Sequence, residues 1–340
     1  MANSDNAATE RTTLDLLIRG FQVSQMIRVI ADLGIADRIP SDGQTAAADL
    51  AAQCGICDQP LIRMLRALAS LHIFAVTTNE NVRHTERSRL LRKDTPGSMH
   101  YGARFWAGPG SWRAWGVLDR ALKGEVPHEV AWGTDRFAYL RGHPEEARVF
   151  DDMMANFPDN RHAAVAETYD FSDVRLIVDV GGGNGAALRH ILARFPQPQG
   201  VLFDRQDVVN ELSSTDFMDG RIEPMGGSFF ERVPPAADLY ILSRVLHDWS
   251  DEDCIKILRV CRSHMQPGSR LLIVEHIIEP DPTQGRPTDY LVDIQMMAMF
   301  GSARARTEDE FRKLLAESGF ALRQHIATKS PVSILECQAV

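Results

Sequence analysis

The sequence predicts a two-domain protein, in which a helical N-terminal domain of winged-helix type precedes an α/β domain with a doubly wound, mostly parallel sheet. Three observations support this fold class. The chain has 340 residues, more than one typical hydrophobic core accommodates. Residues 1–165 show mainly the apolar spacing of helices, whereas residues 166–340 alternate between short apolar strands and helices. Such alternation is typical of parallel sheets that carry helices on both faces.

The N-terminal domain follows the order helix, helix, hairpin. Apolar residues recur at helical spacing over residues 14–33 and 61–68, and Thr45 is expected to cap a short helix between them. Residues 72–85 contain two extended stretches joined by a turn, which predicts a hairpin. The apolar faces at 14–33 and 61–68 exceed what a small domain needs for its own core, so they predict a two-fold homodimer.

The second domain is expected to contain seven strands with helices between them. The expected strands are LIVDV (176–180), GVLFD (200–204), RIEPM (221–225), DLYIL (238–242), RLLIVE (270–275), ALRQHIA (321–327) and SILECQA (333–339). Helices are predicted for residues 184–195, 251–264 and 307–317. The apolar run LIVDV is typical of a strand buried within such a sheet.

Charge and composition exclude several classes of function. Lys and Arg number 37 against 46 Asp and Glu, a net charge of −9, so no partnership with nucleic acid or an anionic membrane is expected. The polar N-terminus does not read as a signal peptide, and no apolar run is long enough to span a membrane, so a cytoplasmic location is expected. The five cysteines are expected to be free thiols, because Cys54 and Cys57 lack a second pair of metal ligands.

A glycine-rich loop follows the strand LIVDV and reads GGGNG over residues 181–185. Glycines allow the backbone to approach a ligand closely, and such sheets bind ligands at the carboxyl ends of their strands. The glycine spacing also fits the dinucleotide of a nicotinamide or flavin enzyme. Asp179, two residues before the loop, favours the ammonium of a methionine moiety and would repel a pyrophosphate. Asp204, which ends the next strand, suits a ribose diol in either case.

Four motifs between residues 176 and 276 resemble those of a known enzyme family. VDVGGGNGAALRHILARFP, GVLFDRQDVV, GGSFF and LSRVLHDWSDEDC are similar to the successive motifs of plant-type small-molecule O-methyltransferases and their bacterial antibiotic-pathway relatives. The likeness covers nearly the whole chain. It implies a class I methyltransferase fold, S-adenosylmethionine as cofactor with S-adenosylhomocysteine as product, no metal, and a homodimer formed through the N-terminal domain. The implied substrate is a hydroxyl of a small aromatic natural product, a polyketide or a phenazine-like phenol.

The resemblance also implies which residues bind the cofactor. Beside Asp179 these are Gly181, Gly183, Asp204, Ser228, Phe229 and Ser243. The two glycines would pass close to the methionine portion, and the Asp204 carboxylate would accept both ribose hydroxyls. Ser228 and Phe229 would flank the adenine. The family usually has Asp at position 228 and often has Lys at position 243, so both contacts are expected to be weaker here.

His247, in the HDW sequence after the fourth strand, is the implied general base. A phenol with a pKa of about 10 is mostly protonated at pH 7, and an imidazole that titrates near neutrality can take its proton. Glu275, which ends the fifth strand, is the implied carboxylate that orients the ring. The family's second carboxylate precedes an Arg-Thr pair, but here Ala305 precedes Arg306, so half of the usual support is missing.

The resemblance places substrate contacts on two helices. Phe150 and Met154 would contact the substrate from a helix before the α/β domain, and Met296, Met299 and Phe300 from the helix after the fifth strand. Methionine and phenylalanine suit a flat aromatic ligand. The same residues also fit an ordinary methionine-rich core between two helices, and that alternative remains open at this point.

Two alternative functions remain open as well. A winged helix is also found in transcription regulators, and Arg63, Arg66 and Arg83 would lie on the recognition helix and wing, although so few cations on an acidic chain are weak support. The absence of a carboxylate at Ala305 also fits a family relative that binds the cofactor but catalyses a hydroxylation or decarboxylation.

Overall fold

The computed structural model describes the backbone of residues 2–340 and the side chains of residues 9–340. The chain forms two compact units. The smaller comprises Met1–Arg113 and Leu140–Pro158, and the larger comprises Ala114–Tyr139 and Asp159–Val340. The chain therefore leaves and re-enters the larger unit, and the division into 1–165 and 166–340 stays a prediction.

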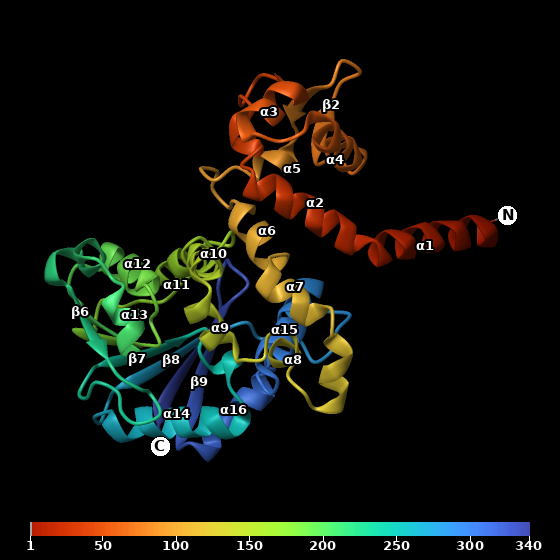
Figure 1. Cartoon of the computed structure of the whole chain (residues 1–340). Coiled ribbons are helices and arrows are strands. Elements are labelled where there is room, and N and C mark those ends of the chain that lie inside the picture. The colour runs from red at the N-terminus through yellow and green to blue at the C-terminus, as the bar shows by residue number, and fades with distance from the viewer. Residues whose placement is uncertain (1) are drawn as a thin grey trace. The chain divides into compact units, whose positions relative to one another are not determined.

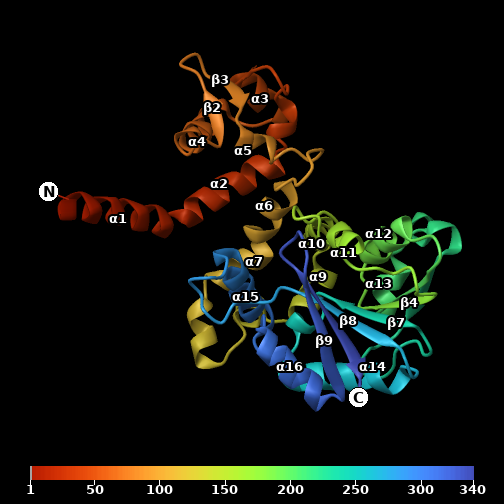
Figure 2. The same ribbon diagram turned by 180° about the vertical axis from the view of Figure 1, so that it is seen from behind.

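A seven-stranded sheet forms the centre of the larger unit (Figures 1 and 2). Its strands are β4 (Leu176–Val180), β5 (Gln199–Asp204), β6 (Ile222–Gly226), β7 (Leu239–Ser243), β8 (Arg270–Glu275), β9 (Phe320–Ala327) and β10 (Ser333–Ala339). The strand order is β6-β5-β4-β7-β8-β10-β9, with β10 antiparallel to both of its neighbours and the first five strands parallel. The expected doubly wound, mostly parallel sheet is confirmed, and all seven expected strands are present.

Apolar side chains on both faces of this sheet explain why helices cover it. On one face, α14 (Asp251–His264) and α16 (Glu308–Glu317) pack against the strands, and Cys254 and Cys261 are buried there. On the other face, α11 (Arg161–Thr168) and α12 (Ala186–Arg194) contribute to a second core. The remaining elements of this unit are η2 (Leu118–Lys123), α8 (Pro127–Trp132), α13 (Gln206–Asn210), η3 (Ser214–Gly220), η4 (Leu246–Asp248) and α15 (Pro287–Phe300).

The strand order changes direction between β4 and β7. From β4 the chain proceeds outward through β5 and β6, and it then returns to the other side of β4 with β7 and β8. The carboxyl ends of neighbouring parallel strands lie at the same edge of a sheet, and ligands bind at the point where the order reverses. The loop after β4 and the turn after β7 therefore lie side by side.

The smaller unit has the expected order of helices and hairpin. It contains α1 (Ala2–Ile18), α2 (Gly20–Asp32), η1 (Ala36–Arg38), β1 (Thr45–Ala46), α3 (Ala47–Cys54), α4 (Asp58–Ser70), β2 (Phe74–Val76), β3 (Asn81–His84), α5 (Glu86–Arg89), α6 (His100–Trp106) and α10 (Pro144–Ala155), while α7 (Pro109–Trp115) and α9 (Arg136–Gly142) cross between the units. The prediction that Thr45 caps a helix is wrong. Thr45 pairs with Val82 as part of a short strand, and α3 begins after Ala46 without a side-chain cap.

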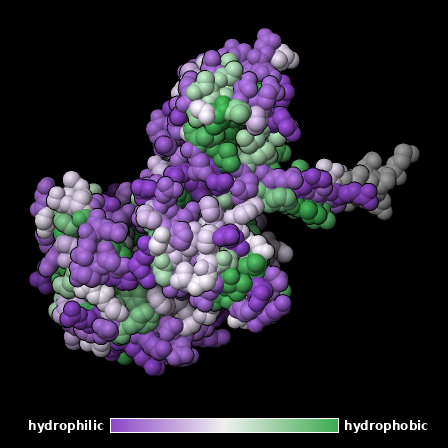
Figure 3. All heavy atoms as spheres, viewed as in Figure 1, coloured by the Kyte–Doolittle hydropathy of each residue, from purple (hydrophilic) through white to green (hydrophobic). Residues whose placement is uncertain are grey.

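The two apolar segments of the smaller unit differ in how they are used. Leu61, Leu65 and Leu68 are buried in the unit's own core, whereas Met64 of the same face is only partly buried and, with Leu61, lines an open groove. The expected place of this face in a dimer interface stays a prediction. The segment where α1 meets α2 remains uncovered, and its exposed apolar side chains are Leu14, Leu16, Leu17, Ile18 and Phe21. Figure 3 shows apolar atoms gathered along these N-terminal helices.

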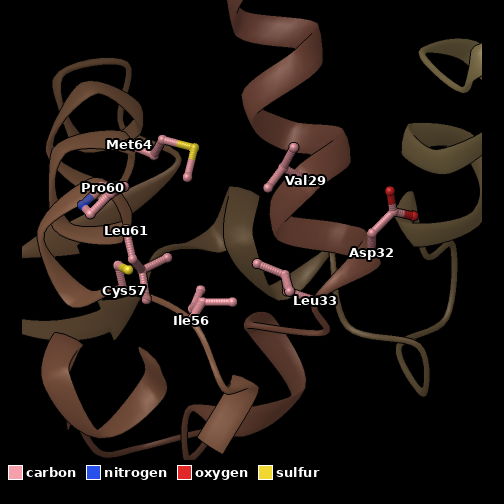
Figure 4. Close-up of a pocket in the computed structure, with 8 residues that line it drawn as sticks. All are labelled: Val29, Asp32, Leu33, Ile56, Cys57, Pro60, Leu61 and Met64. Carbon is pink, nitrogen blue, oxygen red and sulfur yellow. The ribbon is translucent and has the colours of Figure 1, made fainter. Parts of the chain in front are cut away.

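An apolar groove of about 370 Å³ opens beside α2 in the same unit. It lies between α2 on one side and, on the other, α4 with the segment that leads into it (Figure 4), and it is lined by Val29, Asp32, Leu33, Ile56, Cys57, Pro60, Leu61 and Met64. Asp32 is the one charged residue of this lining. Across the residues that the structure describes, no helix combines the length and apolarity that crossing a membrane requires.

Candidate active site

The loop after β4 brings the backbone close to the end of the sheet. Gly181 and Gly183 have φ of +73° and +57°, a conformation that side chains rarely adopt. A Cβ at position 181 would lie 2.8 Å from Val245, and one at position 182 would lie 2.9 Å from the Asp179 carboxyl group. At Gly183 a Cβ would meet nothing within 4 Å. The loop is therefore crowded at Gly181 and Gly182, whereas the space beside Gly183 is open.

Two carboxyl groups lie beneath this loop. Both oxygens of Asp179 are buried without a hydrogen-bond partner among the described residues, and burial, with Asp204 adding to it, raises the pKa of Asp179 to about 7. Asp204 is anchored, since its oxygens accept hydrogen bonds from the backbone N–H of Gly183 at 2.8 Å and of Arg205 at 2.7 Å. Burial raises the pKa of Asp204 as well. A positively charged ligand group would stabilise the ionised form of both carboxyl groups.

The residues expected around the adenine lie close to the glycine loop. Phe229 lies 3.6 Å from the Cβ position of Gly181, and its ring packs edge-on against Trp249, 5.8 Å between centroids. The hydroxyl of Ser228 accepts a hydrogen bond from the backbone N–H of Phe230 at 3.3 Å. Trp249 was not among the expected site residues, although it belongs to the HDW sequence. Ser243 ends β7 and pairs in register with Val274 of β8.

His247 lies on η4, the short 3₁₀ turn that follows β7. The turn is held in place by Arg306, which is fully buried and donates hydrogen bonds to the carbonyls of Leu246 and Trp249, each at 2.9 Å. Asp251 accepts from the same guanidinium at 2.8 and 2.9 Å. The Arg-Thr pair therefore has a structural role that spacing did not reveal, because Arg306 fixes the backbone on either side of the histidine.

The imidazole of His247 lies between two carboxyl groups, and the side chain is 9% exposed. Its Nε2 is 3.2 Å from Asp248 Oδ1, and its Nδ1 is 3.7 Å from Glu275 Oε2. The other oxygen of Glu275 accepts a hydrogen bond from the backbone N–H of His247 at 3.3 Å. The structure thus brings Glu275 and His247 together, with Glu275 contacting the backbone as well as facing the ring.

Charge around the ring is dominated by cations. Burial, followed by the charge of Arg244, holds the pKa of His247 well below its ordinary value, so the expectation that it titrates near neutrality is wrong for the protein without ligands. Desolvation penalises the charged form, and nearby guanidinium groups oppose a second positive charge. Burial raises the pKa of Asp248 to about 8 and also raises that of Glu275. Electrostatically, the site disfavours an imidazolium and favours an anion.

The residue next to Ser243 was missed by sequence reasoning. Arg244 directs its guanidinium toward Glu275, with Nη1 3.6 Å from Oε2. Arg161, at the start of α11, reaches the same region and forms a two-pronged ion pair with Asp159, at 2.9 and 2.5 Å. Arg244 could have been recognised as a site residue because it is a basic residue within the LSRVLHDW motif. Arg161 lies far from this motif in the sequence, and no pattern around it indicated a place in the site.

The residues expected to contact substrate are divided between the two units. Phe150 and Met154 lie on α10 in the smaller unit, where the Phe150 ring is 6.0 Å from that of Phe105. Met299 is buried in a small core of the larger unit, with Phe300 packed against it and 5.5 Å from the ring of Phe137. Met296, one turn earlier on α15, is also mostly buried.

Position 305 contributes its backbone and no carboxylate. The N–H of Ala305 donates a hydrogen bond to Asp293 Oδ1 at 2.7 Å. Asp293 is half-buried on α15, and burial raises its pKa. Asp293 thus anchors the segment that leads into Arg306, and through Arg306 the turn that carries His247.

Comparisons with known proteins agree over both units. Residues 114–321 match the O-methyltransferase domain, and residues 16–94 match the O-methyltransferase dimerisation domain. The chain is 38% identical to the phenazine O-methyltransferase PhzM of Lysobacter antibioticus, over 95% of each chain.

Two solved structures extend this likeness. That of the mitomycin 7-O-methyltransferase MmcR has a TM-score of 0.90 and 32% identity, and the alignment covers 99% of this chain and 100% of that one. NcsB1, an O-methyltransferase from neocarzinostatin biosynthesis, was solved with S-adenosylmethionine and 2-hydroxy-5-methyl naphthoic acid. It has a TM-score of 0.80 and 29% identity, covering 94% of this chain and 96% of that one.

Proposed function

Because the chain belongs to the O-methyltransferase family, we propose that it transfers a methyl group from S-adenosylmethionine to a hydroxyl of a small aromatic natural product. The observation that carries this proposal is the juxtaposition of two features at one end of the sheet. The loop after β4 lies over two buried carboxyl groups, and the turn after β7 carries a buried histidine. The position of Asp179 beneath the loop also disfavours a dinucleotide, because its carboxylate would repel a pyrophosphate.

The residues beneath the glycine loop fit the cofactor. The two partnerless oxygens of Asp179 would receive its ammonium group, and the open side of Gly183 would leave room for the chain beside it. Each Asp204 oxygen uses one lone pair on a backbone N–H, and the remaining lone pairs would accept the ribose hydroxyls. When bound, S-adenosylmethionine supplies a methyl group on a positively charged sulfur.

His247 is the proposed proton acceptor in the reaction. The hydroxyl oxygen of the substrate bonds to the methyl carbon as the carbon–sulfur bond breaks, and the hydroxyl proton passes to the imidazole. Glu275 holds the histidine through its backbone N–H, and Arg306 holds the carbonyls on either side. Burial and nearby cations hold the pKa of the free imidazole low. We therefore expect His247 to accept the proton only when an anion forms beside those cations and offsets their charge.

Replacing Asp204 by alanine tests the cofactor site. We expect the affinity for S-adenosylmethionine to fall by about 1.5–3 kcal/mol, the usual range for hydrogen bonds to a charged group. Titration calorimetry measures this loss. Asp207→Ala is the matched control, because Asp207 is half-exposed and paired only with Arg205 among the contacts that the structure gives it. Tight binding of NAD together with no binding of S-adenosylmethionine or S-adenosylhomocysteine would reject the proposed function.

The proposed acceptor is an aromatic ring system with a free hydroxyl. The names of three relatives support this class, since PhzM is a phenazine O-methyltransferase, MmcR a mitomycin 7-O-methyltransferase, and NcsB1 was solved with a naphthoic acid. Phe300 on α15, which is only partly buried, suits a flat ring. Assays that follow S-adenosylhomocysteine release with hydroxylated phenazines, naphthalenes and benzenes would identify the preferred ring.

We also infer that the protein is a homodimer in which a second copy covers the apolar surface of the smaller unit. The dimerisation-domain match spans most of the exposed segment, from Leu16 onward, and the whole groove lining. Leu17 at the end of α1 and Phe21 at the start of α2 are 71% and 54% exposed, an unfavourable state for large apolar side chains unless a partner covers them. A stable interface of this kind buries over roughly 2,000 Å².

Charges introduced into this segment should separate the dimer. For Leu17→Asp combined with Phe21→Asp we expect light scattering to give the mass of one chain at micromolar concentration, because two carboxylates would be desolvated in the interface. Leu122→Asp is the control. Leu122 is 88% exposed but lies in the larger unit, so its substitution should leave the dimer mass unchanged. A monomer mass for the unmodified protein would contradict the assignment.

A further inference from the structure

Arg244 is a buried cation with unused hydrogen-bonding capacity. Its side chain is only 16% exposed, and a guanidinium has five N–H donors. Within residues 9–340 none of these donors makes a hydrogen bond, and Nη1 is buried without a partner. The ion-pair contact to Glu275, at 3.6 Å, is too long for a hydrogen bond. Burying a guanidinium in this way is unfavourable unless a ligand completes its contacts.

The backbone at Arg244 is held in an unfavourable conformation. Its φ is +60°, in the left-handed region where a long side chain is rarely found. Its N–H is nevertheless tied to the carbonyl of Val274 at 2.9 Å, so the sheet maintains this conformation. Strained residues of this kind are concentrated at functional sites. Here the strain places the guanidinium beside the carboxylate that faces His247.

Two neighbouring guanidinium groups form short hydrogen bonds to carboxylates, which Arg244 does not. Arg161 directs its Nε and Nη2 to Asp159 through two such bonds. Arg286 is likewise held by Asp289, at 2.9 and 3.1 Å. Burial and then Arg244 lower the pKa of His276 to about 2, and the same two causes act on His247, so a positive potential reaches both histidines. An anion placed there would be attracted by the potential and would satisfy the free donors.

We infer that Arg244 binds a carboxylate carried by the substrate ring, so that the acceptor is a hydroxyaryl carboxylic acid; this inference rests on the methyltransferase function proposed above. A planar guanidinium edge matches the two oxygens of a carboxylate. Arg244 Nη1 and His247 Nδ1 lie within 3.6 and 3.7 Å of the same oxygen of Glu275. One aromatic ring can therefore present its hydroxyl to His247 and its carboxylate to Arg244. A neutral phenol would leave the guanidinium with only its long ion-pair contact to Glu275.

The test compares acids with their esters in the dimeric, cofactor-loaded enzyme. The substrates are 2-hydroxybenzoate, 4-hydroxybenzoate and 1-hydroxy-2-naphthoate, each beside its methyl ester, and kcat/KM is measured by S-adenosylhomocysteine release. The unmodified enzyme should prefer the acid in the pair that fits best. Arg244→Met should lower the acid-to-ester ratio of kcat/KM about 10- to 100-fold, as expected for a lost charge-assisted contact, because any effect transmitted through His247 or Glu275 acts on both substrates alike.

Two further variants keep the result interpretable. Arg244→Lys retains the charge but loses the two-pronged edge, so it should lower the acid-to-ester ratio of kcat/KM by an intermediate factor. Arg312→Met is the matched control, because Arg312 lies half-exposed on α16 and pairs with Glu308. It should change neither substrate.

Several outcomes would overturn the inference. Equal losses on acid and ester would mean that Arg244 stabilises the attacking oxygen or the fold and not a carboxylate. Equal or better activity of the unmodified enzyme on the esters would have the same meaning. Failure to methylate any member of the panel, with S-adenosylmethionine binding intact by calorimetry, would contradict the carboxylate assignment alone. Loss of S-adenosylmethionine binding itself would instead contradict the proposed function.

Discussion

Replacing His247 by alanine should lower the rate of methyl transfer by about 10²–10⁴-fold, the usual contribution of a general base, and leave the affinity for S-adenosylmethionine unchanged. The imidazole is buried beside Glu275 and Asp248 on a turn that Arg306 holds rigidly. The residues assigned to the cofactor, Asp179 and Asp204, are contributed by β4 and β5. Loss of the imidazole should therefore remove proton transfer without disturbing that site.

The effect should depend on how acidic the substrate hydroxyl is. A hydroxyl that is already ionised at the assay pH has no proton to lose, so the difference between the two proteins should shrink across a series of decreasing hydroxyl pKa. Single-turnover rates for such a series measure this dependence. His325→Ala is the control, because His325 lies partly exposed at the surface and pairs with Glu308. Equal rates for wild type and His247→Ala on every substrate would show that His247 takes no part in proton transfer.

Asp179→Asn should stabilise the free protein at pH 8 while weakening cofactor binding. Burial raises the pKa of Asp179 from 3.8 to about 7, so above pH 7 the fold contains a buried carboxylate without a partner. A carboxyl group whose pKa is raised by folding stabilises the fold below its unfolded pKa, and this stabilisation is lost as pH rises through the folded pKa. The advantage of asparagine should thus grow between about pH 4 and pH 7, then level off at roughly 1–4 kcal/mol.

When cofactor is present, the wild-type protein should instead become more stable than Asp179→Asn. The ionised Asp179 is the proposed partner of the cofactor ammonium, so wild-type affinity should fall by up to about tenfold per pH unit below pH 7, whereas that of Asp179→Asn should be weak and nearly independent of pH. Thermal unfolding with and without S-adenosylmethionine, at pH 5 and pH 8, measures both effects. Asp170→Asn is the control, since Asp170 is exposed. If asparagine at 179 were neutral to stability at pH 8, Asp179 would not be a buried, uncompensated charge.

Local patterns in the sequence were sufficient for the fold class. The seven strands lie where apolar runs predicted them, and LIVDV coincides with β4 from its first to its last residue. Helix α14 likewise spans the expected residues 251–264. These predictions succeeded because the alternation and helical spacing of apolar residues record directly which side of an element is buried. Thr45 is the counterexample: its expected role rested on helix-capping propensity, but pairing with Val82 decided the outcome.

The candidate site, like the fold, could be predicted from the sequence only in part. The glycine loop, Asp204 and the HDW sequence are contiguous motifs at strand ends, so their juxtaposition could be expected from a parallel sheet alone. Motifs did not predict the environment of His247, in which Arg244, Arg161 and Asp248 lie beside Glu275. The low pKa of the imidazole follows from this environment, as does the unused guanidinium of Arg244.

By itself, then, the sequence determined the elements, their order in a parallel sheet, and the strand ends where a cofactor and a base would lie. Only the tertiary structure decided which charges meet there and how deeply they are buried. The physical reason is that hydrophobic periodicity is a property of neighbouring residues, whereas desolvation and Coulomb interactions depend on distances between residues such as Arg161 and Arg244, which are 83 positions apart in the chain.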